Sequence, residues 1–132
     1  MKKSLLLIML LCGITLGVFA QKTQETPVGV SVLDEQPQFK GGMPALQVFV
    51  SKNIKLPQEA RNNHVNGEVV VHFIIEKDGT ISNVSVGKGI GYGCDEEAVR
   101  VVKKMPKWIA GKKNKEAVRV KYMLPISFQT GE

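Results

Sequence analysis

The 132-residue sequence has few of the residues that build cross-links, metal sites or nucleophilic active sites. Cysteine occurs only as Cys12 and Cys94, and histidine only as His64 and His72. The two histidines lack the cysteine or carboxylate neighbours of a zinc site, and no serine or cysteine has a recognisable activating partner. We therefore expect no metal, no cofactor and no enzymatic activity.

A hydrophobic run long enough for a typical membrane-spanning helix, roughly 20 residues, is also missing. The longest run, residues 5–20, follows two lysines and ends in Val18-Phe19-Ala20 before a polar stretch. This layout is typical of a cleavable secretory signal. We expect a signal peptide at residues 1–20, with a retained inner-membrane anchor as the alternative. Cleavage would remove Cys12, so Cys94 would have no partner for an intramolecular disulfide.

Removing residues 1–20 leaves 112 residues, which is enough for one compact domain. We expect a short linker at residues 21–36 and the domain at residues 37–130. Nine basic residues lie between Arg100 and Lys121, opposed only by Glu116. They form either a solvated surface or a patch that attracts an acidic peptide, an anionic glycan or lipid headgroups. No nucleic-acid motif accompanies them, so nucleic acid is not an expected partner.

The pattern along the domain predicts helices and strands in a mixed order. Pro44 opens a predicted helix to about Asn53, because proline is favoured at the first helical position, and a short helical turn follows at residues 56–61. Residues 67–76 alternate apolar and polar side chains as a strand does. The return strand, residues 80–87, changes phase, which predicts a bulge near Asn83.

A second helix and a final strand complete the pattern. Asp95 is the expected N-cap of a one-faced helix that Pro106 ends, and Trp108 is expected in the core. The final strand runs from Val118 to Phe128. The predicted fold class is α+β, a small antiparallel sheet of about three strands with two helices packed on one face.

The final strand carries Pro125, and proline cannot donate a hydrogen bond to a neighbouring strand. A strand that tolerates proline is usually at the edge of a sheet, where another peptide can add as a further strand. The sequence therefore favours a binding module.

Several segments of the domain, taken in order, resemble the C-terminal domain of TonB proteins. They are Pro37-Gln38-Phe39-Lys40-Gly41-Gly42, Leu56-Pro57-Gln58-Glu59-Ala60, Gly67-Glu68-Val69-Val70-Val71-His72-Phe73, Asp78-Gly79-Thr80-Ile81-Ser82-Asn83-Val84, Cys94-Asp95-Glu96-Glu97-Ala98, Met105-Pro106-Lys107-Trp108 and Leu124-Pro125-Ile126-Ser127-Phe128. The resemblance implies a periplasmic domain that captures the short N-terminal peptide of an outer-membrane transporter beside its last strand. The residues that this implies for partner binding are Val118, Arg119, Val120, Lys121, Tyr122, Met123, Leu124 and Ile126. Arg119 and Lys121 are expected to face the partner or solvent.

An alternative function is a stand-alone envelope adaptor or sensor that binds peptidoglycan or another envelope protein. TonB proteins otherwise carry an uncleaved membrane helix with a histidine and then a long proline-rich spacer. Here the apolar segment contains no histidine, and only the 16 residues 21–36 separate it from the domain. An unpaired last strand can also pair with its own copy, so a homodimer is a further alternative.

Overall fold

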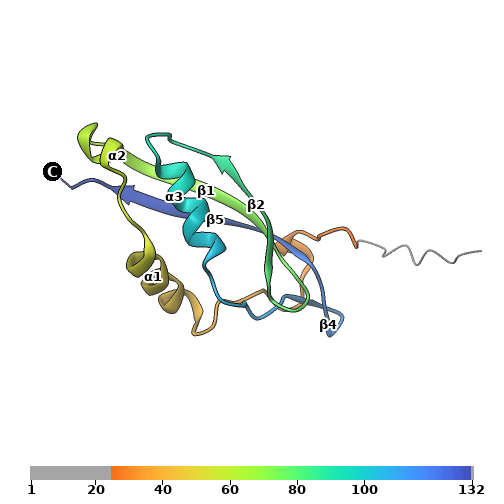
Figure 1. Cartoon of the computed structure of the whole chain (residues 1–132). Helices are drawn as coiled ribbons and strands as arrows, with labels where there is room; N and C mark the ends of the chain where they lie inside the picture. The colour runs from red at the N-terminus through yellow and green to blue at the C-terminus, as the bar shows by residue number, and fades with distance from the viewer. Residues whose placement is uncertain (1–24, 132) are drawn as a thin grey trace, which may run out of the picture.

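The computed structural model describes residues 25–131, so the expected signal peptide and the start of the expected linker lie outside the described residues. A three-stranded antiparallel sheet with β1 (Asn66–Ile75) in the centre organises the fold (Figure 1). β2 (Ile81–Lys88) and β5 (Val120–Gln129) are its two edges. Helices accompany the sheet, which confirms the predicted α+β class. Among the described residues, no helix has the length and apolar character to cross a membrane.

The hydrophobic alternation of β1 divides the sheet into a core face and an open face. Val69, Val71, Phe73 and Ile75 are buried on the core face, as expected from the two-residue period of a strand. β1 pairs with β5 without interruption, from Asn66 opposite Gln129 to Ile75 opposite Val120.

The β1–β2 pairing contains the bulge that the sequence predicts. His72 lies opposite Ser85, whereas Ile74 lies opposite Ser82, so three residues of β2 accompany two of β1. Asn83 takes a positive φ of 50° within that interval. Asparagine tolerates this left-handed conformation better than most residues, so the local sequence fits the bulge.

Within the described residues, three α-helices accompany the core face: the two predicted helices and the predicted short helical turn. α1 (Gly42–Asn53) and α3 (Cys94–Lys103) are the two long ones, and α2 (Gln58–Asn62) is a single short turn (Figure 1). The N-cap of α3 is Gly93, so the assignment of Asp95 as N-cap is wrong. The Asp95 carboxylate instead accepts hydrogen bonds from the main-chain N–H groups of Ile90 and Gly91, at 2.8 and 3.2 Å. The glycine-rich loop between β2 and α3, residues 89–93, folds back over the start of the helix and brings these N–H groups within reach of the carboxylate.

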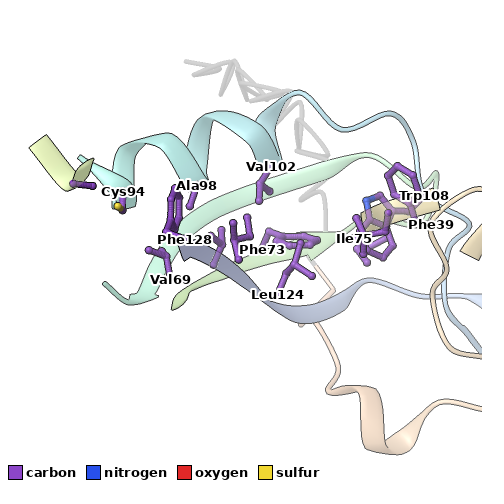
Figure 2. Packing of buried hydrophobic residues seen from close by; sticks show 14 residues of the cluster. Phe39, Val69, Phe73, Ile75, Cys94, Ala98, Val102, Trp108, Leu124 and Phe128 are labelled. Atoms are coloured by element: carbon purple, nitrogen blue, oxygen red, sulfur yellow. The ribbon is translucent and has the colours of Figure 1, made fainter. Parts of the chain in front are cut away.

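The core lies between the sheet and α3, and an aromatic cluster closes one end of it (Figure 2). Trp108 is 3 % exposed, which confirms its predicted place in the core. Its ring centroid lies 5.5 Å from that of Phe39, 5.8 Å from that of Phe73 and 5.1 Å from that of Tyr122. Phe39 also packs against Phe49 of α1 at 5.7 Å. The cluster therefore fixes the position of α1 relative to β1 and β5.

Residues 25–36, called the N-terminal strap below, lie against the domain. Val28 forms a single parallel bridge with Val120, and the chain then forms the short 3₁₀ helix η1 (Val30–Val32). The chain turns here because the N–H groups of Asp34 and Glu35 both donate to the carbonyl of Lys112, at 2.9 and 3.1 Å.

The basic turn before β5 is itself a small hairpin. β3 (Lys112–Lys113) pairs with β4 (Glu116–Ala117) across Asn114 and Lys115. Both turn residues have positive φ, 51° and 66°, as in the tight turns that connect two-residue hairpins.

Candidate functional site

The outer edge of β5 has the geometry to receive another strand. Lys121 donates its N–H to the carbonyl of Val28 at 2.9 Å, and Arg119 accepts from the N–H of Val28 at 3.0 Å. Main-chain groups alternate in direction along a strand, and the β1–β5 register is uninterrupted. The N–H and C=O groups of Met123 and Ser127 therefore point away from β1, together with the C=O of Pro125.

Pro125 occupies an outward-directed position, which explains why the sheet tolerates it. Its missing N–H would have pointed away from β1, so no bond between β1 and β5 is lost. Within residues 25–131, no hydrogen bond joins the outward N–H groups of Met123 and Ser127 to another group. The edge thus offers two donors beyond the strap, separated by one position without a donor.

The N-terminal strap already uses the first position on this edge. Val28 pairs with β5 in the parallel direction and leaves after one bridge, because the chain enters η1. The strap is further held by Glu25, whose carbonyl accepts from the Arg119 guanidinium at 2.6 Å and whose carboxylate pairs with Lys77. One residue of the chain itself therefore pairs with this edge, and it does so in the parallel direction.

A groove of about 480 Å³ runs between α1 and β5, directly beside the free part of the edge. Among the described residues, none of the side chains that line it is charged. The walls consist of Met43, Leu46, Gln47, Val50 and Ser51 from α1, of Ile54 at its C-terminal end, and of residues 122–127 from β5. Met43 is 55 % exposed, although it is a large apolar residue.

A second hollow, of about 650 Å³, lies on the open face of the sheet under the strap. Val30, His72, Ile74 and Lys121 are among its lining residues, and Met123, 65 % exposed, lines both hollows. The free edge of β5 therefore lies between an uncharged groove on one side and a hollow with a lysine at its border on the other.

The eight residues predicted to bind a partner differ in whether they belong to β5 and in whether their side chains are buried. Their main chain follows the edge, but β5 begins at Val120, so Val118 and Arg119 precede it. The side chains of Val120, Leu124 and Ile126 are buried in the core, Tyr122 is half-buried, and Lys121 and Met123 are exposed.

The side chain of Arg119 is held by groups of the chain itself and does not project freely into solvent. It donates to the Glu76 carboxylate through Nε at 2.7 Å and through Nη2 at 3.0 Å. These bonds hold the pKa of the Glu76 carboxyl below its ordinary value. An arginine that alternates with apolar residues looks like a surface residue in the sequence, and only the pairing of β1 with β5, in which Ile75 lies opposite Val120, brings Glu76 beside it.

Sequence reasoning missed two components of the site. The first is Val28, which lies in the segment expected to be a linker and pairs with β5. The second is the wall formed by α1, of which Met43 and Val50 are exposed or half-buried members. The number of apolar residues in α1 could have indicated that the helix exposes apolar side chains outside the core. It could not have identified β5 as the strand beside them.

The remaining candidate groups do not form a reactive centre. Cys94 is fully buried, and the loss of solvent around its thiol, with Asp95 and Glu96 nearby, raises its pKa. A buried thiol with a raised pKa is a poor nucleophile. In the part of the chain that the structure describes, no three His, Cys, Asp or Glu side chains gather as a metal site.

Comparisons with known proteins agree with this geometry. The family model for the C-terminal region of the Gram-negative bacterial TonB protein matches residues 52–130. The NMR structure of the Helicobacter pylori TonB C-terminal domain, residues 194–285, is 25 % identical and has a TM-score of 0.50; the match covers 68 % of this chain and 95 % of that one. A longer form, residues 179–285, is 23 % identical with a TM-score of 0.48, and that match covers 66 % of this chain and 78 % of that one.

No match was found among curated proteins. The family model spans β1, β2 and β5, which build the sheet and its free edge, and also α3, which packs on the sheet. The family is non-catalytic, its domain is periplasmic in Gram-negative bacteria, and it acts with TonB-dependent receptors of the outer membrane. The chain belongs to the TonB C-terminal domain family.

Proposed function

We propose that this domain captures an extended peptide of an outer-membrane transporter by adding it as a strand to the outer edge of β5. The observation that carries the proposal is the set of outward main-chain groups at Met123, Pro125 and Ser127, which have the spacing of a strand edge. Main-chain hydrogen bonds supply affinity in this type of recognition, and side-chain hollows beside the edge supply specificity.

A proline substitution at an outward position tests the proposal without breaking the sheet. Met123→Pro removes one outward donor and leaves every bond between β1 and β5 in place, as Pro125 does in the native chain. Met123→Ala is the matched control, because it removes the same side chain and keeps the N–H. We expect Met123→Pro to weaken binding of a transporter peptide at least about fivefold, since a hydrogen bond contributes about 1 kcal/mol and the ring also obstructs the edge.

Fluorescence anisotropy with a labelled peptide from the N-terminus of a transporter measures the effect, and circular dichroism establishes that both variants fold. Equal affinity for Met123→Pro and Met123→Ala would refute strand addition. If no transporter peptide binds while peptidoglycan does, the domain is an envelope adaptor. If Met123→Pro changes only self-association, measured by sedimentation, the edge serves a homodimer.

We further propose that residues 1–20 are removed on export and that the mature chain begins at Gln21. The support is the sequence layout of two lysines, an apolar run and a small residue before a polar stretch. The intact mass of the protein from a periplasmic extract distinguishes a first residue of Gln21 from a retained Met1.

A further inference from the structure

The groove between α1 and β5 lies where the side chains of an added strand would project. We propose that it is the specificity site of the partner peptide and that it takes three uncharged, apolar side chains from alternate positions of a parallel strand. This proposal rests on the proposed function, because the groove has an occupant only if a strand adds to β5.

The N-terminal strap defines the geometry of the added strand. Val28 lies opposite Val120 in a parallel bridge, donates to the carbonyl of Arg119 and accepts from the N–H of Lys121. The same pattern repeats every two residues along a parallel pair. The next three peptide residues that direct both main-chain groups toward β5, as Val28 does, lie opposite Tyr122, Leu124 and Ile126.

Side chains directly opposite each other in a sheet point to the same face. Leu124 and Ile126 point into the core side, and they line the groove together with Tyr122. The three peptide side chains opposite them therefore point toward α1. The peptide side chains between them, opposite Met123 and Pro125, point to the open face.

The chemistry of the groove selects for apolar side chains. Its α1 wall presents Met43, Leu46, Val50 and Ile54, with Gln47 and Ser51 as its only polar side chains. A charged side chain there would lose water without gaining an ion pair, which is costly. On the open face the border residue is Lys121, so an acidic residue fits among the peptide positions on that side.

The position of Pro125 also predicts where the partner peptide can contain proline. The middle groove-facing residue, opposite Leu124, donates to the carbonyl of Met123 but meets no donor at Pro125, so its own carbonyl stays with water. The N–H groups of the peptide residues that point to the open face are directed away from β5. Proline is therefore acceptable at those positions in the partner and unacceptable at the groove-facing ones.

Two variants of α1 separate the groove from the rest of the surface. Met43 and Val48 are both large apolar residues with similar exposure, 55 % and 51 %, but only Met43 lines the groove. Met43→Glu places a charge at the groove and Val48→Glu places the same charge on another face of the helix. The probe is the synthetic peptide acetyl-Glu-Val-Thr-Val-Thr-Val-Thr-amide, whose three valines match the alternation.

We expect Met43→Glu to weaken binding of the probe at least about tenfold and Val48→Glu to leave it within about twofold. Met123→Pro should weaken it at least about fivefold, as for a transporter peptide. Replacing the central valine of the peptide by lysine should cost far more affinity than replacing the threonine next to it. Isothermal titration calorimetry gives the affinities, and urea unfolding checks that both glutamate variants remain folded.

Equal affinities for Met43→Glu and Val48→Glu would overturn the groove assignment, and strand addition would stand if Met123→Pro still weakened binding relative to Met123→Ala. A wild-type protein that binds transporter peptides but not the probe would also overturn the assignment. A Met43→Glu variant that loses self-association but binds the probe normally would make the groove part of a homodimer interface and refute its role in peptide selection.

Discussion

Pro125 limits the number of hydrogen bonds that the edge of β5 can offer, so replacing it should strengthen peptide capture. Pro125→Ala restores an outward N–H between those of Met123 and Ser127. In the parallel arrangement set by Val28, the new donor meets the carbonyl of the peptide residue opposite Leu124. A net hydrogen bond contributes about 0.5 to 1.5 kcal/mol, which corresponds to an affinity about two- to twelvefold higher.

The assay is a calorimetric titration of the wild type, Pro125→Ala and Ser127→Ala with the alternating valine peptide. Ser127→Ala is the control, because it changes an exposed side chain on the same edge and keeps the main-chain groups. Pro125→Ala should also self-associate more strongly, since a more complete edge is a better template for pairing. If a folded Pro125→Ala variant bound the peptide no more tightly than the wild type, main-chain pairing along this part of β5 would be refuted.

Two further predictions concern the stability of the fold around the site. Gly79 and Gly91 both have positive φ, but a Cβ at Gly79 would lie 1.9 Å from the carbonyl oxygen of Trp108, whereas one at Gly91 would meet nothing within 4 Å. Gly91→Ala should lower the free energy of unfolding by about 1 to 2 kcal/mol and Gly79→Ala by about 1 to 3 kcal/mol more. Urea unfolding followed by the fluorescence of Trp108 measures both, and equal losses would refute the role of the close contact. Glu76 has a lowered pKa because Arg119 donates to it, so their pair stabilises the fold fully above the unfolded carboxyl pKa of about 4.3 and loses this effect as the pH falls through the lower folded value. Glu76→Gln should therefore cost about 1 kcal/mol at pH 7 and nothing below the folded pKa, and a loss that does not depend on pH would contradict this reasoning.

The N-terminal strap and the proposed peptide site share one edge, and this affects where a partner can begin to pair. Val28 uses the N–H of Lys121 and the carbonyl of Arg119. The partner strand therefore starts at the carbonyl of Lys121 and the N–H of Met123. A longer partner would have to displace the strap together with the ion pair between Glu25 and Lys77.

Local sequence patterns determined most of the fold. The alternation of residues 67–76, the phase change at Asn83 and the helix stop at Pro106 each depend on conformational preferences of a few adjacent residues. The edge position of the last strand follows from the missing N–H of Pro125. These effects depend on residues close together in the sequence, so the corresponding structure can be predicted without the tertiary structure.

The tertiary structure decided the partner-facing surface. The groove lies between α1 and β5, two elements far apart in the sequence, and α1 reaches the core through the contact of Phe49 with Phe39, which packs on Trp108. Arg119 pairs with Glu76 because the pairing of β1 with β5 brings the two side chains within 2.7 Å, although 43 positions separate them. Such contacts depend on the simultaneous packing of distant segments, and no local pattern specifies that packing. The sequence by itself therefore determined which strand is the edge, and only the packing of α1 and the strap decided what lies beside it.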